Sequence, residues 1–398
     1  MHEEHKAERG LRPDSEVPVK ALHVSTHINI GGIGNYILSL ASALKSKGID
    51  CVVASSGGSL LPEFGRQGIA HEKLDMKTKF EFGPKVIKSA FAIAGIIKKE
   101  NIDIVHAHSR VSQVASRIAC AMTGTPLVTT CHGYFKKRFR GIIDTWGEKV
   151  IAISDAVRGH LKDDLGVREE RIVLIYNGVD PVRFSVSHSD EDIGVLKESS
   201  GVSGGPVIGT IGRLSSVKGH KFLVEAMAAV LSKHRNASMI IVGDGPEKAA
   251  LKSLAKLLGI DKSVHFISSV LDTERMLAIM DVFVFPSIRE GLGIALLEAL
   301  AAGKACVASD VGGIGDIIKA SSCGVLVKPC DARAIAESVS SLLTDPAKRK
   351  EMGENGRKVV RMRFSLEAMA EKVAGLYRDL VGSKSIVHPS TGLGTGSP

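Results

Sequence analysis

Short apolar runs alternate with amphipathic stretches along most of this chain. Runs rich in branched and aromatic residues lie at 20–25, 50–54, 102–106 and 126–130, and segments with helical periodicity separate them. Continuous apolar runs are typical of strands buried on both faces of a parallel sheet, and the intervening helices are typical of βαβ units. The pattern therefore predicts an α/β protein built from Rossmann-like units.

The periodicity is interrupted between about 185 and 205, where Ser, Asp and Gly predominate. Beyond this stretch, apolar runs return at 207–212, 239–242, 281–285 and 305–308, and amphipathic helices are expected at 331–344, 346–361 and 365–381. A length of 398 residues suits two domains, each with its own core. The expected order is a mobile arm at 1–18, an N-terminal domain at 19–184, a linker at 185–205, a second domain at 206–364, a final helix at 365–381 and a disordered tail at 382–398.

The formal net charge is +9, and most of the surplus lies in the first half. Residues 20–183 contain 23 Lys and Arg against 15 Asp and Glu, whereas residues 184–381 contain 25 against 23. This asymmetry predicts an anionic ligand or an anionic membrane surface on the N-terminal side. Nucleic acid is not expected as a partner, because aromatic residues make up only 4% of the chain and no nucleic-acid-binding motif occurs.

The six cysteines contain no Cys-x-x-Cys pair, so we expect reduced thiols and neither a disulfide framework nor a zinc site. His106 and His108 lie at a predicted strand end without further ligands nearby in sequence, and we expect no metal there. No apolar run approaches the ~20 residues that cross a bilayer, and the first residues do not resemble a secretory signal. These features predict a cytoplasmic protein.

Two carboxylates distinguish the segment 285–303, in which a buried strand passes into a helix. Glu290 lies at the junction, where the free N–H groups of a helix amino terminus favour an anionic ligand. Glu298 shares a helix face with apolar residues, where an unpartnered carboxylate is costly. The structural alternatives are that Glu290 caps the helix and that Glu298 forms an ion pair with a neighbouring basic side chain. The residues between the strand and the helix that offer backbone groups are Gly291, Leu292, Gly293 and Ile294.

Two other predicted strand ends carry glycine or basic residues. Gly31 and Gly32 follow the first strand in a loop that lacks the Gly-x-Gly-x-x-Gly spacing, which argues against a nicotinamide dehydrogenase. Arg213 and Lys218 lie five residues apart between a strand and a helix, where both cations can face a phosphate. A plain tight turn and solvated surface cations are the alternatives.

Ser-x-x-Glu-Gly-Leu-Gly, the Glu-x7-Glu spacing and Glu-Ala-Leu-Ala-Ala-Gly together resemble the signature of retaining GT-B glycosyltransferases of family 4. The resemblance covers roughly 20–381 and includes the Gly-Gly loop, the Arg213 and Lys218 pair and Asn177-Gly178-Val179-Asp180 in the family order. It implies two Rossmann-like domains that face a central cleft, with the acceptor on the first and the donor nucleotide on the second. It also implies that the last helix crosses back onto the first domain.

The resemblance implies roles for single residues. Glu290 contacts hydroxyls of the donor sugar, and Glu298 binds the ribose of its nucleotide. Arg213 and Lys218 neutralise the donor diphosphate together with the amides of 291–294, and Gly31 and Gly32 approach the diphosphate and the acceptor. His132 reaches across the cleft to the donor sugar, whereas His108 is expected to be structural.

The implied reaction moves a sugar from a nucleoside diphosphate sugar to a hydroxyl of a glycan or lipid-linked acceptor, with retained anomeric configuration and without a metal or other cofactor. Synthesis of cell-envelope polysaccharide or lipopolysaccharide is the expected setting. Asp190-Glu191-Asp192 lies in the expected linker and is interpreted as solvated charge. Two alternatives remain, a nucleotide-sugar epimerase of the same fold and a noncatalytic nucleotide-sugar-binding scaffold.

Basic and aromatic residues interleave between Phe135 and Arg140, and the segment 77–82 has a similar composition. A solvated loop is the default interpretation of such a charge run, and peripheral contact with an anionic membrane or a phosphorylated acceptor is the alternative. The chain departs from the family pattern at Ile314-Gly315-Asp316, where relatives commonly carry Pro-Glu.

Overall fold

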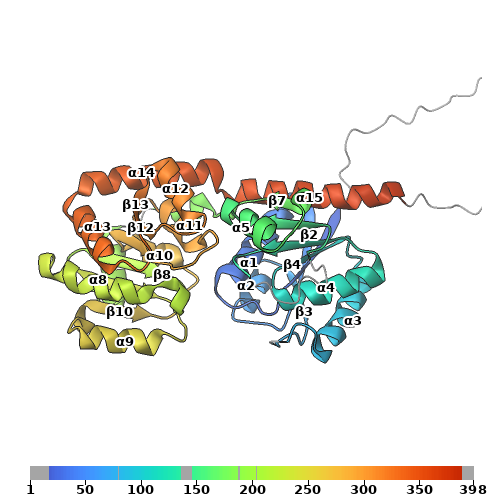
Figure 1. Ribbon diagram of the computed structural model, residues 1–398, viewed down its shortest axis with the longest axis horizontal. Coiled ribbons are helices and arrows are strands. Elements are labelled where there is room, and N and C mark those ends of the chain that lie inside the picture. The colour runs from blue at the N-terminus through green and yellow to red at the C-terminus, as the bar shows by residue number, and fades with distance from the viewer. Residues whose placement is uncertain (1–17, 79, 136–145, 187–188, 203, 388–398) are drawn as a thin grey trace, which may run out of the picture.

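The computed structural model describes residues 18–78, 80–135, 146–186, 189–202 and 204–387. Three stretches of the sequence analysis therefore lie outside the described residues: the arm up to residue 17, the basic loop from 136 to 145, and the tail from residue 388. Figure 1 shows two α/β bodies side by side, each with a sheet between layers of helices.

The first body is built on a seven-stranded parallel sheet with the order β3-β2-β1-β4-β5-β6-β7. Its strands are β1 (Val19–Val24), β2 (Ile49–Ser55), β3 (Ala70–Lys73), β4 (Ile104–Ala107), β5 (Leu127–Cys131), β6 (Lys149–Ala152) and β7 (Ile172–Leu174). The connecting helices are α1 (Gly32–Lys45), α2 (Leu61–Arg66), α3 (Pro84–Lys99), α4 (Arg110–Thr123) and α5 (Asp155–Gly159), with the short turns η1 (His160–Asp164) and η2 (Glu169–Arg171) before β7.

The second body has a six-stranded parallel sheet with the order β10-β9-β8-β11-β12-β13. Its strands are β8 (Val207–Ile211), β9 (Ser238–Val242), β10 (Val264–Ile267), β11 (Val282–Phe285), β12 (Ala305–Ser309) and β13 (Gly324–Val327). Its helices are α8 (His220–Lys233), α9 (Lys248–Leu257), α10 (Thr273–Ala278), α11 (Ile294–Ala301), α12 (Ile314–Ser321), α13 (Ala332–Thr344) and α14 (Pro346–Arg363), with the turns η3 (Ser216–Lys218) and η4 (Asp261–Ser263). The predicted pair of parallel-sheet Rossmann-like domains is confirmed.

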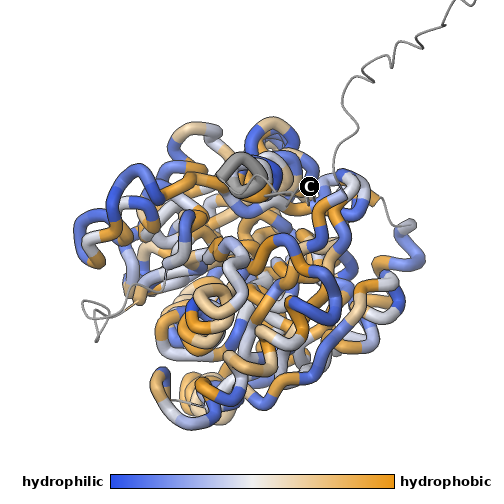
Figure 2. Tube along the Cα trace, turned by 90° about the vertical axis from the view of Figure 1, so that its right-hand side faces the viewer, coloured by the Kyte–Doolittle hydropathy of each residue, from blue (hydrophilic) through white to orange (hydrophobic). Residues whose placement is uncertain are grey.

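The central strands are buried along their whole length, as their continuous apolar runs predict. Every residue of β4, β5, β8, β9, β11 and β12 is buried. Figure 2 shows that hydrophobic residues gather in the interior of the molecule and hydrophilic residues around its outside. Helices on both faces of each sheet therefore bury the strands and leave the strand ends free to carry polar side chains.

The stretch expected to be an irregular linker contains helices. After α6 (Pro181–Phe184), helix α7 covers Asp190–Ser199 and buries Leu196 against the second body. Ser189 and Asp192 form a reciprocal capping box at its start, which explains why this polar sequence is helical. The side chains of 190–192 are exposed, as predicted, and Asp192 acts as part of this cap.

The last helix, α15 (Leu366–Val387), leaves the second body and lies along the first, as Figure 1 shows. Tyr377 is fully buried there, and its hydroxyl lies 2.6 Å from Nδ1 of His106 on β4. Lys47 at the end of α1 pairs with Glu371 of α15 at 2.9 Å. These contacts tie the end of the described chain to its beginning.

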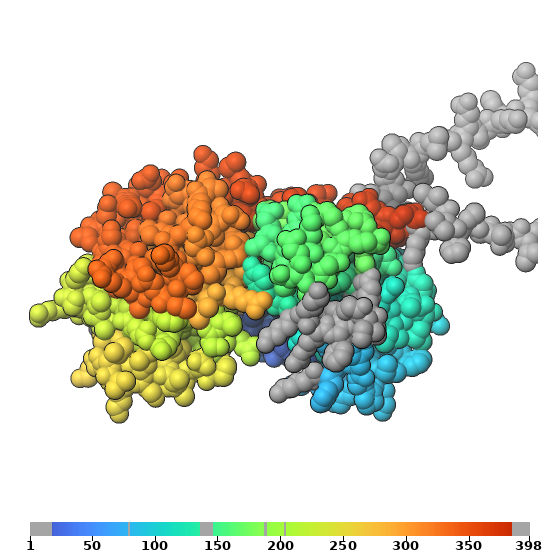
Figure 3. Space-filling model, in the orientation of Figure 1, coloured from blue at the N-terminus to red at the C-terminus, as the bar shows by residue number. Residues whose placement is uncertain are grey.

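Figure 3 shows the two bodies as lobes that meet along a groove. The residues that follow β5 and β6 in the first body contact the β11–α11 connection of the second body at this junction. Within the described part of the chain, no helix is both long and apolar enough to cross a bilayer.

Candidate active site

The connection from β11 to α11 forms the second-domain wall of the site. Gly293 precedes α11 with φ +87°, a region that favours glycine, and a Cβ there would lie 2.8 Å from the Phe285 ring. Leu292 is fully buried and fixes the loop to the core. Among the described residues no side chain caps the amino terminus of α11, so the N–H groups that precede its first internal hydrogen bonds are available to an anion.

Glu290 and Lys218 are brought together from segments 72 residues apart. Nζ of Lys218 forms an ion pair with Oε2 of Glu290, and the hydroxyl of Ser287 lies 3.4 Å from the same oxygen. Lys218 Nζ also lies 5.2 Å from the centre of the Phe285 ring. The pair is half-buried, with 24% of the Lys218 side chain and 14% of the Glu290 side chain exposed, so water screens the attraction between the two charges less than it would on an open surface.

The same loop contacts the first domain. The Ser154 hydroxyl donates to the Gly291 carbonyl at 2.8 Å. A Cβ on Gly291 would lie 3.2 Å from the His132 carbonyl oxygen and 3.3 Å from Cα of Gly133. The Arg289 guanidinium lies 4.7 Å from the centre of the Tyr134 ring. His132 and the Glu290 loop, both predicted as site elements, are therefore neighbours across the domain junction.

Gly31 and Gly32 lie at the amino terminus of α1 and are exposed. Gly31 has φ +150°, and among the described residues no atom lies within 4 Å of the position that a Cβ would take on Gly31 or Gly32. The backbone of this loop is thus open to the approach of a ligand, as the sequence predicts.

Arg213 is exposed at the rim of the second domain, separate from the half-buried Lys218 and Glu290 pair. Burial lowers the pKa of His27 in the first domain, and the nearby positive charges of Arg213 and Lys77 lower it further. Three basic side chains from both domains thus gather at this rim.

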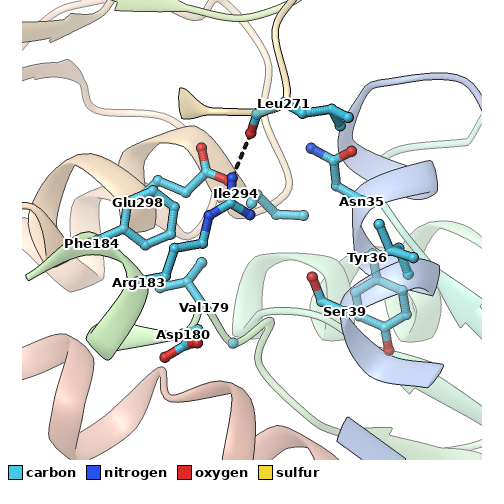
Figure 4. Close-up of a pocket in the computed structure, with 12 residues that line it drawn as sticks. Asn35, Tyr36, Ser39, Val179, Asp180, Arg183, Phe184, Leu271, Ile294 and Glu298 are labelled. Carbon is cyan, nitrogen blue, oxygen red and sulfur yellow. Dashed lines mark hydrogen bonds between the residues drawn. The ribbon is translucent and has the colours of Figure 1, made fainter. Parts of the chain in front are cut away.

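Glu298 lines a pocket between the domains, about 580 Å³ in volume including its open mouth. Figure 4 shows α1 on one wall of the pocket, and α11 together with the segment 178–184 on the other wall. Arg183 donates to the Leu271 carbonyl at 2.5 Å and to Glu274 at 2.7 Å. The pocket residues are Asn35, Tyr36, Leu38, Ser39, Gly178, Val179, Asp180, Arg183, Phe184, Leu271, Ile294 and Glu298.

Burial raises the pKa of Glu298 to about 7, and the nearby positive charge of Arg183 opposes this rise. Only 8% of the residue is exposed. On the opposite wall, the buried Oδ1 atom of Asn35 has no hydrogen-bond partner among the described residues. A ligand with hydroxyl groups, such as a ribose, could donate to both of these acceptors.

Four histidines, His23, His106, His108 and His132, lie close together in the first domain beside the domain junction. His23, His106 and His108 are fully buried, and their ring nitrogens lie close enough together to be considered as metal ligands. However, every ring nitrogen of these three already has a partner, which for His106 is the Tyr377 hydroxyl on one side and the Thr130 hydroxyl on the other. A cation would have to displace these hydrogen bonds. His108 bonds directly to His132, so it is linked to the site, which the sequence analysis did not anticipate.

Sequence reasoning missed His23, Tyr36 and Arg183. His23 is a polar residue in the middle of a buried strand, a signal that could have been read. Tyr36 stands edge-on to the His132 ring at 4.8 Å, and Arg183 reaches Leu271 of the other domain; neither contact has a sequence signal of its own.

Two parallel-sheet domains with basic and carboxylate side chains at their junction are the arrangement that GT-B glycosyltransferases share. Family comparison agrees, since the family described as Glycosyl transferases group 1 matches residues 194–359 and that described as Glycosyltransferase Family 4 matches residues 30–183. The chain belongs to glycosyltransferase family 4, and the protein is a glycosyltransferase.

Two curated relatives show the range of the family. The chain is 26% identical to the N-acetyl-alpha-D-glucosaminyl L-malate synthase of Bacillus anthracis over 379 residues, which cover 90% of this chain and 96% of that protein. It is 28% identical to the UDP-Gal:alpha-D-GlcNAc-diphosphoundecaprenol alpha-1,3-galactosyltransferase of Escherichia coli over 318 residues, or 75% of this chain and 81% of that protein.

Solved structures agree with the fold. A glycosyltransferase from Rickettsia africae superposes with a TM-score of 0.79 at 27% identity, covering 91% of this chain and 98% of that one. Anabaena HepE in complex with UDP and glucose superposes with a TM-score of 0.80 at 23% identity, covering 90% and 99%. The alternatives of an epimerase and a noncatalytic scaffold gain no support from these matches.

Proposed function

We propose that the enzyme transfers a glycosyl group from a nucleoside diphosphate sugar to an acceptor hydroxyl, with retained anomeric configuration and without a catalytic metal. The observation that carries this proposal is the convergence of Lys218, Glu290 and the Gly291 loop with His132 at the domain junction. The pocket beside Glu298 is lined by Ile294 of α11 and by Tyr36, whose ring contacts His132, and it offers hydrogen-bond acceptors to a ribose. A donor lying across these groups would span nucleotide, diphosphate and sugar.

The charges of the site suit the breaking bond. When the bond between the anomeric carbon and the diphosphate oxygen breaks, negative charge grows on the diphosphate. Lys218, Arg213 and the N–H groups at the start of α11 would stabilise that charge, each contributing about 3 kcal/mol by comparison with an oxyanion donor. Glu290 would accept hydrogen bonds from sugar hydroxyls and hold the ring in place.

Retention follows most simply from a front-face route. The bond from the anomeric carbon to the diphosphate breaks while the acceptor oxygen forms its bond on the same face of the sugar. The acceptor proton passes to the leaving diphosphate oxygen, so this route requires no nucleophilic side chain. His132 would donate a hydrogen bond to the sugar and orient it during the transfer.

The acceptor is proposed to be a glycan or a lipid-linked glycan of the cell envelope. A relative acts on a diphosphoundecaprenol-linked sugar by name, and another is a capsular polysaccharide biosynthesis glycosyltransferase of Staphylococcus aureus. Apolar side chains are exposed on and before α3, at Phe80, Phe82, Ile87 and Phe91, among exposed lysines. This combination suits peripheral contact with the inner face of an anionic membrane.

The proposal is tested by incubating the purified enzyme with nucleoside diphosphate sugars and candidate acceptors. We expect release of one nucleoside diphosphate that depends on the acceptor, and a product whose anomeric signals in NMR have the donor's configuration. A product of inverted configuration would refute retention. A change of the sugar while it stays on the nucleotide would favour the epimerase.

A further inference from the structure

Three imidazoles form a continuous row from the cleft into the first domain. Nε2 of His132 lies 3.3 Å from Nδ1 of His108, and Nε2 of His108 lies 3.0 Å from Nδ1 of His23. The far nitrogen of His23, Nε2, lies 3.7 Å from Sγ of Cys51 on the neighbouring strand β2. The row uses both nitrogens of the two inner histidines and leaves one nitrogen, Nδ1, of His132.

All three rings are neutral at physiological pH. Burial lowers the pKa of His23 and of His132 to about 3, and burial followed by the neighbouring imidazoles lowers the pKa of His108 well below its ordinary value. A neutral imidazole carries one N–H and one bare nitrogen. Three such rings carry three N–H groups, and the two hydrogen bonds within the row use two of them. The third N–H must lie at one end, on Nδ1 of His132 or on Nε2 of His23.

The thiol at the buried end selects between these two arrangements. Burial raises the pKa of Cys51 to about 12, so the sulfur keeps its proton and can donate it to Nε2 of His23. The opposite arrangement requires an imidazole N–H to donate to sulfur, which is a weak acceptor, while the thiol turns to the Ile49 carbonyl 3.9 Å away. The first arrangement gives the thiol, a weak donor, the basic imidazole nitrogen as its acceptor and avoids bonding an imidazole N–H to sulfur, so we take it as the favoured one.

We propose that Cys51, His23 and His108 are positioning residues that hold His132 in its Nδ1–H tautomer, so that His132 presents a hydrogen-bond donor to the cleft. The proton order runs from the thiol to His23, from His23 to His108 and from His108 to His132. Without this row, His132 would favour the Nε2–H tautomer that is commoner for a free imidazole, and its cleft-facing nitrogen would be a bare acceptor. A donor at that place suits the oxygen atoms of a sugar and avoids a titrating charge. This last step rests on the proposed function, whereas the tautomer itself does not.

The test is a long-range ¹H–¹⁵N correlation spectrum of the full-length protein labelled with ¹⁵N-histidine, in which the His132 signals are assigned by their loss in His132→Asn. We expect Nδ1 of His132 to resonate as the protonated nitrogen and Nε2 as the bare one. A wild-type spectrum with the proton on Nε2 would overturn the proposal, and this result needs no variant that could misfold.

Variants of Cys51, at the inner end of the row, test whether the thiol sets the tautomer of His132. Cys51→Ala removes the donor and should shift His132 toward the Nε2–H tautomer, whereas Cys51→Ser keeps a donor and should preserve the wild-type signals. Cys306→Ala, which removes a fully buried thiol from the second domain, should change nothing in the His132 signals. Wild-type signals in Cys51→Ala would show that the thiol does not set the proton order.

A kinetic measurement separates positioning from stability. Cys51→Ala should lower kcat about 3- to 10-fold and leave the affinity for the bare nucleoside diphosphate unchanged, and Cys51→Ser should restore kcat, because His132 is proposed to act on the sugar. Equal kcat values for Cys51→Ala and the wild type would refute the link to the reaction. If no transferase activity is found while the Nδ1–H tautomer is seen, the proposed function fails and the inferred proton order stands.

Discussion

Lys218 and Glu290 form an ion pair inside the proposed donor site, although 72 residues separate them in sequence. Removing only one partner of a pair in a poorly solvated site leaves a charge without compensation. A bound diphosphate would supply a new anionic partner for Lys218 and leave Glu290 free to accept hydrogen bonds from a sugar. The pair therefore links the binding of the diphosphate to the orientation of the sugar.

Neutralising each partner should have different effects. Lys218→Gln should weaken binding of the nucleoside diphosphate and lower kcat about 100-fold, comparable with the loss of an oxyanion donor. Glu290→Gln should lower kcat similarly but bind the bare nucleoside diphosphate at least as tightly as the wild type, because Lys218 is released. Titration calorimetry and steady-state kinetics measure both. Lys221→Gln, an exposed lysine of α8, is the matched control and should behave as the wild type. Equal losses of nucleotide affinity in the two site variants would argue against this division of roles.

The close approach at Gly291 should be sensitive to one added methyl group. A Cβ at this position meets the His132 carbonyl at 3.2 Å and Gly133 at 3.3 Å, so Gly291→Ala must push the two domains apart by a few tenths of an ångström. We expect kcat to fall at least 10-fold, since misplacement of reacting groups is costly, with a change in the free energy of unfolding below about 2 kcal/mol. Gly95→Ala on the open face of α3 is the control. Wild-type kinetics in Gly291→Ala would show that the approach has no part in turnover.

Glu298 should make stability depend on pH. Its folded pKa of about 7 exceeds the ordinary 4.5, so the folded protein binds this proton more tightly than the unfolded chain, and the contribution to stability falls as pH rises from 4.5 to 7. At 1.36 kcal/mol per pKa unit the loss amounts to about 3 kcal/mol. Gln at position 298 does not titrate, so the free energy of unfolding of Glu298→Gln should rise relative to that of the wild type as the pH increases from 4.5 to 7. The variant should also bind nucleotide more weakly than the wild type. Urea titrations at several pH values measure the free energy of unfolding, and a pH-independent difference would contradict the raised pKa.

The buried histidines should have the opposite pH dependence. The folded pKa values of His23 and His132 are about 3, below the ordinary 6.5, so their contribution is complete above pH 6.5 and is lost as the pH falls toward 3. At pH 5, each of these two histidines lowers the free energy of unfolding by about 2 kcal/mol relative to its value above pH 6.5. Fluorescence of the single tryptophan, Trp146, reports unfolding at each pH. His23→Gln should reduce the acid dependence by about one proton, and an unchanged slope would show that this histidine does not stay neutral.

The sequence predicted the strands that are buried and the loops that follow them, because continuous apolar runs and glycine-bearing strand ends are local signals. It missed β3, whose residues Ala70–Lys73 are largely polar and half-exposed at the edge of the sheet. It also missed α7, where a capping box and one buried leucine offset a polar composition.

The site divides along the same line. Glu290, Glu298 and Lys218 lie in motifs and could be named as candidates from the sequence, whereas the His23 to His132 row depends on the register of three strands. Parallel pairing places His23 of β1 opposite His106 of β4, and the next strand end brings His108 toward His132. Such contacts between segments about 85 residues apart have no local signal, and neither does the reach of Arg183 to Leu271.

The central claim is that the junction between the two domains binds a nucleoside diphosphate sugar. The most direct measurement is the melting temperature of the purified protein with UDP, GDP, ADP or TDP at saturating concentration, repeated on Lys218→Gln and Glu298→Ala. A ligand that binds only the folded state must raise this temperature. We predict that one nucleoside diphosphate raises it in the wild type and raises it less in both variants. A wild-type protein that is folded and shows no shift with any nucleotide, or a shift that is equal in all three proteins, would contradict the account.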